Sequence, residues 1–289
     1  MRTYVVLDKK VGETPLEALT AWKAANPDYA DMPASYAGRL DPMASGALLV
    51  LLGDECKRRD AYTGLDKEYE VEVVLDASTD TGDALGLTTL NATQSRLENR
   101  AILGALRCLS GTHRVPYPAF SSKAVSGKPL FQYALEGTLG SITIPEHDET
   151  VYRAELLGVQ HLDADALRER VRALLAHVPR SDDPRKTHGA DFRQDDIRAR
   201  WEEAFKKLEA EPESQASAPR IFTMLTLRIA CASGTYMRTF ASRLAQELGT
   251  TGFALSIHRT KMGRHMMLGP FRFWRKQYTL TDTSGRVSP

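Results

Sequence analysis

The apolar run at residues 47–52 (ALLVLL) constrains the fold more than any other stretch of the sequence. It lies between Gly46 and Gly53, and a short apolar run bounded by glycines is typical of a buried strand. The preceding segment, residues 38–45 (GRLDPMAS), contains an Asp-Pro pair, which favours a turn. We therefore expect Asp41 to lie on a tight loop held by a core strand. A surface turn without any chemical role is the alternative that this stretch alone leaves open.

Composition excludes several classes of protein. The 289 residues are 42% hydrophobic and 26% charged with a formal net charge of +1, as in an ordinary globular protein of one large or two smaller domains. No signal peptide opens the chain and no apolar run approaches the ~18 residues of a membrane span, so we expect a cytoplasmic protein without membrane contact. The three cysteines form no CxxC-type pair, which argues against a disulfide framework or a zinc site.

Local patterns predict a mixture of helices and strands. Thr14, followed by Pro and then by Glu three residues after the cap, predicts a helix that ends near residue 26. Residues 67–73 alternate in polarity as a strand does, with Tyr69 on the apolar side. Residues 94–109 predict an amphipathic helix. Its expected inner face is Leu97, Ile102, Leu103 and Leu106.

The second half of the chain contains a segment of different character. Residues 162–220 hold two apolar stripes at helical spacing, separated by a charged stretch and followed by a linker-like composition at 211–217. We interpret 162–220 as a two-helix hairpin inserted into the domain. Such stripes more often pack on each other or on the host core than on a partner. An alternating strand at 222–229 follows, and then a helix that ends at Gly249.

Few chemical motifs are present. The sequence contains no phosphate-binding glycine loop, no GxSxG elbow and no HExxH pair, and its histidines are scattered. What remains is Asp41, Tyr69 and Arg238, together with a basic and aromatic segment at 113–123. Cations and rings suit RNA, although rings in such a loop can equally fill the core. A carboxylate without a metal or cofactor can act at a sugar carbon as a nucleophile, acid or base.

Five segments together resemble the TruB family of tRNA pseudouridine synthases. Residues 38–46 resemble its G-x-L-D-P-x-A-[ST]-G signature. The other four segments follow the family's order. They are 7–12 (LDKKVG, like D-K-P-x-G), 67–69 with 79–86 (KEY and TDTGDALG, like K-x-Y and T-D-T-x-D-x-x-G), 116–131 (like P-P-x-Y-S-A-x-K-x-x-G-x-x-L-Y) and 233–239 (SGTYMRT, like S-x-G-T-Y-I-R-T).

The resemblance implies an isomerase that converts uridine into pseudouridine without cofactor or metal, at the T-loop uridine 55 of tRNA. By similarity Asp41 starts cleavage of the glycosidic bond, and the uracil then rotates and rejoins through C5. Whether the carboxylate attacks C1′ or removes the 2′ proton is open. Tyr69 matches the ring that stacks on the flipped base, Arg238 the cation beside Asp41, and Asp83 a second carboxylate near that arginine.

The remaining expected substrate contacts are Tyr36, Tyr236 and Lys9. Tyr236 and Lys9 lie within matched motifs, whereas Tyr36 replaces the histidine of the family's G-H-x-G. A tyrosine can stack but cannot act as a neutral imidazole, so Tyr36 leaves the same chemistry on another uridine as an alternative. Lys10 replaces a proline of the family pattern, and Tyr117 separates two prolines that the family places together.

The implied fold is α+β, with a mixed, mainly antiparallel sheet flanked by helices and a central RNA-binding cleft. We expect one catalytic domain over residues 1–289, a monomer, and no separate C-terminal PUA-type domain. The basic tail from His258 onward or the insertion would then supply RNA affinity. Deletion of 163–218 is expected to weaken RNA binding and leave folding intact. The alternatives are the same chemistry on another uridine, or a non-catalytic tRNA-folding chaperone; a sugar hydrolase is disfavoured because no second general acid is evident.

Overall fold

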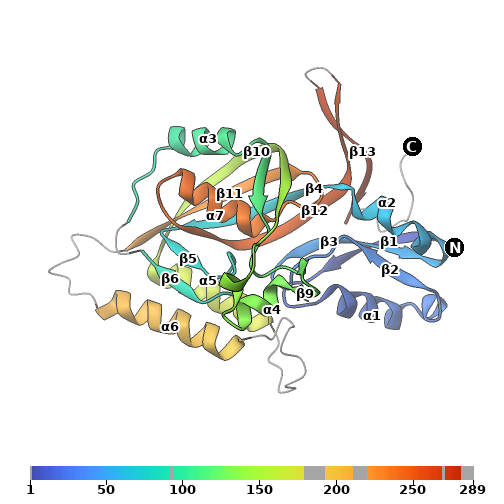
Figure 1. The fold of residues 1–289 in the computed structure, drawn as a ribbon, viewed down its shortest axis with the longest axis horizontal. Helices are drawn as coiled ribbons and strands as arrows, with labels where there is room; N and C mark the ends of the chain where they lie inside the picture. The colour runs from blue at the N-terminus through green and yellow to red at the C-terminus, as the bar shows by residue number, and fades with distance from the viewer. Residues whose placement is uncertain (1, 92–93, 179–192, 211–219, 269–270, 281–289) are drawn as a thin grey trace.

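The computed structural model describes residues 2–91, 94–178, 193–210, 220–268 and 271–280. Its main element is one mixed sheet of nine strands, with the order β1-β3-β12-β4-β11-β10-β7 and with β2 and β13 paired to β3 and β12 (Figure 1). The strands are β1 (Tyr4–Lys9), β2 (Ala34–Ala37), β3 (Ser45–Leu52), β4 (Asp66–Leu75), β7 (Gly111–Pro116), β10 (Glu146–Asp163), β11 (Ile221–Cys231), β12 (Gly252–Leu268) and β13 (Phe271–Thr279). β3 and β12 run parallel, and the other paired neighbours run antiparallel. The expected α+β architecture is therefore confirmed.

Helices cover both faces of this sheet, and small hairpins lie beside it. The helices are α1 (Pro15–Ala25), α2 (Arg59–Thr63), α3 (Asn99–Cys108), α4 (Leu130–Leu135), α5 (Ala164–His177), α6 (Gln194–Ala210) and α7 (Met237–Glu247). The hairpins are β5 (Ala77–Thr79) with β6 (Thr88–Leu90), and β8 (Ala124–Val125) with β9 (Lys128–Pro129). None of the described helices is long and apolar enough to span a membrane.

The local predictions for the N-terminal half hold in most details. β3 has seven buried residues among its eight, and the side chains from Ala47 to Leu51 are fully buried. Thr14 and Glu17 form the predicted capping box at the start of α1. Tyr69 lies on the buried side of β4.

The prediction for 94–109 was wrong in two respects. α3 begins only at Asn99, and Leu103 points to solvent with 43% exposure. A helical face that contains Ile102 continues at Ala105, Leu106 and Leu109, and these four residues are buried. Leu97 precedes the helix and packs partly buried against the same core cluster.

The predicted two-helix segment does form two helices, which belong to the main core. α5 and α6 contribute Leu167, Val171, Trp201 and Phe205, all at most 1% exposed, to a cluster that includes Phe222, Met224, Phe253 and Leu255 of β11 and β12. Removal of 163–218 would uncover that face of the sheet, so the expectation of intact folding after this deletion is not supported. The charged stretch at 179–192 and the linker-like 211–217 lie outside the described residues. That 162–220 is an insertion stays a prediction.

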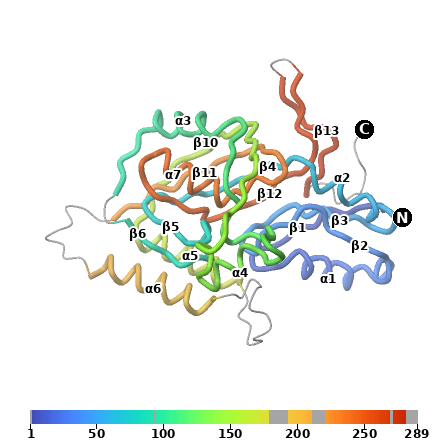
Figure 2. Tube along the Cα trace, in the orientation of Figure 1, coloured from blue at the N-terminus to red at the C-terminus, as the bar shows by residue number. Residues whose placement is uncertain are grey.

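The expected basic tail from His258 onward begins within a strand of the sheet. β12 lies in the middle of the sheet between β3 and β4, and Arg259 is fully buried there. Beyond the sheet, β12 pairs with β13 in a hairpin that projects from the body (Figures 1 and 2). The segment predicted as irregular, 113–123, begins as the edge strand β7, which ends at Pro116 as expected for proline at a sheet edge.

Candidate active site

Asp41 lies on the loop between β2 and β3, where it begins a turn closed by a hydrogen bond from the Ala44 N–H to the Asp41 carbonyl at 3.0 Å. Its carboxylate is 44% exposed and faces a cavity of about 730 Å³. The Asp41 loop, β4, the turn at 81–85, the segment 120–122 and the segment 233–238 line this cavity. A concave site of this size can hold a nucleotide base with its sugar.

Two buried cations hold the Asp41 loop from beneath. The Lys9 ammonium donates hydrogen bonds to the carbonyls of Lys10, Pro42 and Ala44 at 2.9, 3.3 and 2.6 Å. The Arg259 guanidinium donates to the carbonyls of Ala47, Gly38 and Arg39 at 2.7, 3.1 and 3.3 Å. Both side chains are fully buried. Because carbonyl oxygens on both sides of Asp41 are thereby anchored, the carboxylate is presented from a rigid support.

Lys9 therefore lies behind the loop and not among the residues that line the cavity. Burial lowers the pKa of its ammonium to about 8. The expectation that Lys9 contacts substrate finds no support in this geometry, which makes it a positioning residue. Sequence reasoning missed the same role for Arg259, since a basic residue within a basic run carries no sign of burial.

Glycine is required at one point of this support. Gly46 has φ +99°, and a β-carbon there would lie 2.4 Å from the Arg259 carbonyl oxygen. The close approach of β3 to β12 at this residue is what brings the Arg259 side chain under the loop.

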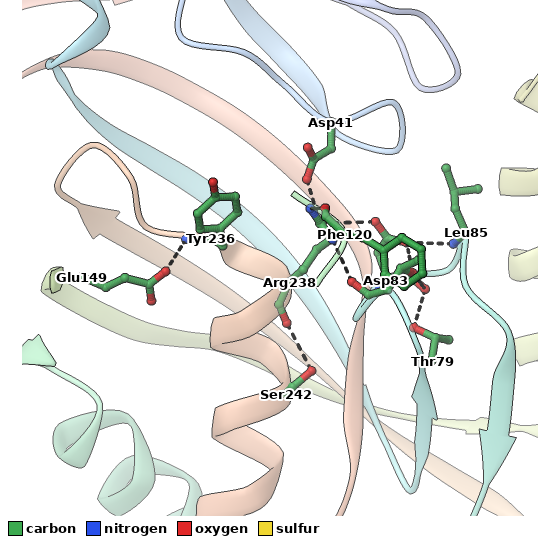
Figure 3. Close-up of polar contacts among 10 residues, drawn as sticks. Asp41, Thr79, Asp83, Leu85, Phe120, Glu149, Tyr236, Arg238 and Ser242 are labelled. Atoms are coloured by element: carbon green, nitrogen blue, oxygen red, sulfur yellow. Dashed lines mark hydrogen bonds and ion pairs between the residues drawn. The ribbon is translucent and has the colours of Figure 1, made fainter. Parts of the chain in front are cut away.

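Arg238, in the first turn of α7, joins three segments of the site (Figure 3). Its Nε donates to the Asp41 carboxylate at 2.7 Å, Nη1 to the Thr81 carbonyl at 2.8 Å and Nη2 to the Phe120 carbonyl at 3.0 Å. The carboxylate of Asp83 lies 3.6 Å from the same Nε. Burial alone would lower the pKa of Arg238, but the two carboxylates raise it above its ordinary value. The guanidinium stays charged and orients Asp41.

Asp83 supports this arrangement from the buried side. Its carboxylate accepts hydrogen bonds from the Thr81 hydroxyl at 2.7 Å and the Leu85 N–H at 3.0 Å. Burial raises the pKa of Asp83 to about 6, an effect opposed by Arg238. The carboxylate therefore acts mainly on Arg238 and on the turn around it.

The three expected tyrosines all line the cavity. Burial raises the pKa of Tyr69 to about 12, so its ring is neutral near pH 7. Tyr36 comes from β2, and Tyr236 immediately precedes α7. The Tyr236 ring makes edge contacts with Tyr117 at 6.4 Å and His147 at 5.9 Å between ring centroids. The cavity thus combines the exposed Asp41 carboxylate with the aromatic rings of the three tyrosines that line it.

Comparison with known proteins identifies a family model and relatives that this chain resembles. The model of the TruB family pseudouridylate synthase N-terminal domain matches residues 31–172. The chain is therefore similar to the TruB family over this range. Among its relatives, tRNA pseudouridine synthase B of Aromatoleum aromaticum is 28% identical over 90% of this chain, and that of Xanthomonas euvesicatoria is 29% identical over 91%.

These alignments cover different shares of the relatives. The chain spans 80% of the Xanthomonas protein and 62% of the Aromatoleum protein, but only 52% of the synthase B of Psychrobacter arcticus, to which it is 23% identical. The solved Cbf5-Nop10-Gar1 complex contains a chain of the same fold, with a TM-score of 0.51 and 16% identity over 90% of this chain and 48% of that one. The family resemblance thus extends to the pseudouridine synthase fold.

The structure also contains a support that the sequence did not indicate. Glu149 on β10 is buried, and its carboxylate accepts a hydrogen bond from the Tyr236 N–H at 2.9 Å at the start of α7. His147 Nε2 and Arg243 Nη1 lie 3.4 and 3.6 Å from this carboxylate. Burial raises the pKa of Glu149. Glu149 therefore stabilises the point where Tyr236 and Arg238 enter the cavity.

The basic and aromatic segment 113–123 divides between packing and the cavity. Tyr117 stacks on His147 with 3.9 Å between ring centroids, and the Lys123 ammonium lies 5.0 Å from the Tyr117 ring. Phe120 and Ser121 line the cavity. The packing interpretation thus applies to Tyr117, and contact of this segment with RNA stays a prediction. Within the described ranges, no cluster of three or more His, Cys, Asp or Glu side chains could hold a metal ion.

Proposed function

We propose that the protein is a pseudouridine synthase that isomerises uridine to pseudouridine in tRNA. The observation that carries the proposal is the exposed Asp41 carboxylate, ion-paired at 2.7 Å to the buried Arg238 within a cavity lined by Tyr69. A carboxylate oriented by a guanidinium can act at a sugar carbon without a cofactor. The names of the relatives support tRNA as the substrate.

The residues lining the cavity suit each step of such a reaction. A uridine flipped out of its loop would enter the cavity and stack on the Tyr69 ring, which offsets part of the cost of unstacking. Asp41 would start cleavage of the C1′–N1 bond, by attack on C1′ or by removal of the 2′ proton. The uracil would rotate, C5 would bond to C1′, and the proton on C5 would leave as N1 regains one.

Arg238 and Asp83 act in this proposal as positioning groups for Asp41. Tyr36 and Tyr236 are the remaining candidates for contact with the RNA around the target nucleotide. The resemblance to tRNA pseudouridine synthases supports the T-loop uridine 55 as the target. Tyr36 lines the cavity and stands where the family carries histidine. If the protein modifies another uridine, this substitution is the one that would account for the different target.

Tritium release from tRNA labelled with [5-³H]uridine tests the activity, because C5 loses its hydrogen only if the base rejoins through C5. Asp41→Asn should reduce release to background and leave tRNA binding measurable. The matched control is Asp54→Asn, since the Asp54 side chain is 94% exposed and is not among the residues that line the cavity. Wild-type protein that releases no tritium from any tRNA would contradict the proposal. Full biological rescue by Asp41→Asn would favour the chaperone alternative.

The target uridine requires a separate measurement. Carbodiimide treatment and sequencing of RNA from a deletion strain should reveal the loss of one pseudouridine in the T loop. Loss at a different position would contradict the T-loop assignment and retain the activity. Tyr36→His then tests whether this residue contributes to the choice of uridine. If it does, the variant should change the rate of tritium release at the T-loop uridine relative to the rate at other uridines.

A further inference from the structure

The outer part of the β12–β13 hairpin has no part in the site described above. β12 pairs with β4 as far as Gly263, and among the described strands residues 264–268 pair only with 271–275 of β13. The hairpin extends away from the sheet and helices (Figures 1 and 2). Residues 261–280 include five lysines and arginines but neither aspartate nor glutamate. This is a strongly cationic element in a chain whose formal net charge is only +1.

One face of the hairpin is fastened to the body. The His265 ring stacks on Tyr152 of β10 with 4.8 Å between centroids and an interplanar angle of 11°. The His265 N–H donates to the Asp66 carboxylate at 2.8 Å, and the Arg272 guanidinium donates to the Tyr152 carbonyl. Trp274, opposite His265, contacts it edge-on at 5.2 Å. These contacts hold the base of the hairpin in one orientation.

The opposite face is exposed and combines arginine with apolar side chains. Directly paired residues of an antiparallel ladder lie on the same face, and that face recurs every second residue. The pairs Arg264–Arg275, Met266–Phe273 and Leu268–Phe271 therefore share the face turned away from His265 and Trp274. Phe271 is 73% exposed and Phe273 45%. Within the described ranges neither Arg264 nor Arg275 forms an ion pair.

We propose that this outer face binds RNA at a part of the substrate distant from the target nucleotide; the inference rests on the proposed function. β12 contacts β3 at His258, beside the Asp41 loop, and Leu268 lies ten residues further along. At about 3.3 Å per residue, the end of the hairpin lies roughly 30 Å from the site along the strand. Arginines would meet phosphates, and exposed phenylalanines offer surfaces on which bases stack.

The charge pattern favours RNA over a second copy of the chain. Five cations without an acidic residue would repel an identical hairpin and attract a polyanion. A rigid base and an exposed cationic and aromatic face are also what a binder of single-stranded or looped RNA requires. The hairpin would thus add affinity for the whole tRNA while the cavity handles the nucleotide.

The test compares full-chain variants for binding to an in vitro transcribed tRNA, by filter binding over a salt series. Phe271→Ser with Phe273→Ser should weaken binding about tenfold or more. Arg264→Gln with Arg275→Gln should make the slope of log K against log salt shallower by about 1.4–1.8. The control, Arg100→Gln with Arg107→Gln, removes two exposed cations from α3 and should leave affinity unchanged.

Thermal melting of each variant tests folding, and all four phenylalanine and arginine sites are exposed enough for wild-type melting temperatures to be expected. Wild-type tRNA affinity in both hairpin variants would overturn the inference. So would a wild-type dimer, detected by sedimentation, that the phenylalanine variant dissociates without loss of RNA affinity. Tritium release separates the two proposals. An active wild type with hairpin-independent binding overturns only the inference, whereas an inactive wild type with hairpin-dependent binding overturns only the proposed activity.

Discussion

Arg238 is the residue on which the geometry of the site depends most. Its guanidinium donates to a carboxylate on one loop and to carbonyls on two others, and these partners lie 118 to 197 residues away in sequence. A planar guanidinium can hold three diverging acceptors at once, whereas an ammonium is a compact charge with fewer fixed directions. The Arg238 side chain therefore both orients Asp41 and holds together the segments that line the cavity.

Arg238→Lys keeps the charge but cannot reach all three acceptors. We expect tritium release to fall at least about 100-fold, and urea unfolding to show a loss of about 2–4 kcal/mol, because buried carbonyls lose their donors. Arg228→Lys is the control, since Arg228 forms a partly exposed pair with Glu70 and its loss should change stability by less than about 1 kcal/mol. Wild-type release by Arg238→Lys would exclude the positioning role.

The raised pKa of the buried Asp83 carboxyl predicts that the stability of the protein depends on pH. Its carboxyl takes up a proton near pH 6 in the folded state and near pH 3.8 when unfolded. Between these values the folded state binds more protons, so the stability contributed by Asp83 falls as pH rises through this window and is constant above it. Asp83→Asn removes this dependence.

Urea unfolding of wild type and Asp83→Asn between pH 4 and pH 7 measures this difference. Relative to wild type, the variant should gain roughly 1–3 kcal/mol as pH rises across the window. Asp54→Asn, a change at an exposed carboxylate, should run parallel to wild type. A parallel curve for Asp83→Asn would show that the carboxyl titrates alike in both states.

The Asp41 loop is held in place by side chains from two strands, β1 and β12, neither of which borders the loop in sequence. β1 supplies Lys9 and β12 supplies Arg259, and their hydrogen bonds reach carbonyls from Gly38 to Ala47. Loops usually carry high mobility, and buried donors at both ends reduce it. A catalytic carboxylate gains from such support because small displacements of a reacting group reduce rate strongly.

Lys9→Met tests the support without any change in the cavity lining. The three carbonyls that Lys9 bonds would lose their donor, so we expect a loss of about 2–4 kcal/mol in the free energy of unfolding and a reduced kcat. Lys10→Met is the matched control: the adjacent ammonium is 66% exposed and pairs with Asp8 on the surface. Equal stability of the two variants would contradict the role of Lys9.

At the scale of the whole molecule, the α5–α6 segment is bound to the site as well as to the core. The Trp201 indole N–H donates to the Ala84 carbonyl at 3.1 Å, next to Asp83. The Arg193 guanidinium donates to the Asp80 carboxylate at 2.8 Å, and Gln194 lines the cavity. One hydrophobic cluster therefore links the predicted insertion to the turn that holds Arg238.

Trp201→Ala should lower the free energy of unfolding by about 3–5 kcal/mol, because a fully buried indole leaves a large cavity. Tritium release should fall as well, through the lost bond to Ala84. The control is Leu103→Ala on α3, where the side chain is 43% exposed and the loss should stay below about 1 kcal/mol. Chemical denaturation of both variants measures the two losses in the free energy of unfolding. A small effect of Trp201→Ala would restore the view of α5 and α6 as a separable insertion.

Elements with local sequence signals could be predicted before any coordinates were known. The apolar run 47–52 predicted β3, Thr14 and Glu17 predicted the start of α1, and alternation placed Tyr69 on the buried side of β4. The order of five motifs also brought Asp41, Tyr69 and Arg238 into one expected site. Each of these predictions rests on residues a few positions apart, or on the order of motifs along the chain, and both can be read from the sequence.

The tertiary structure alone decided which charged residues are buried and what they hold. Arg259 lies in a basic run, Glu149 in an acidic one and Lys9 beside an exposed lysine, yet all three are buried donors or acceptors. Each of the three has a hydrogen-bond partner far along the chain, 35 residues away for Lys9, 87 for Glu149 and 221 for Arg259. A single sequence does not reveal such contacts, because burial of a charge depends on strands that pair only in the folded molecule.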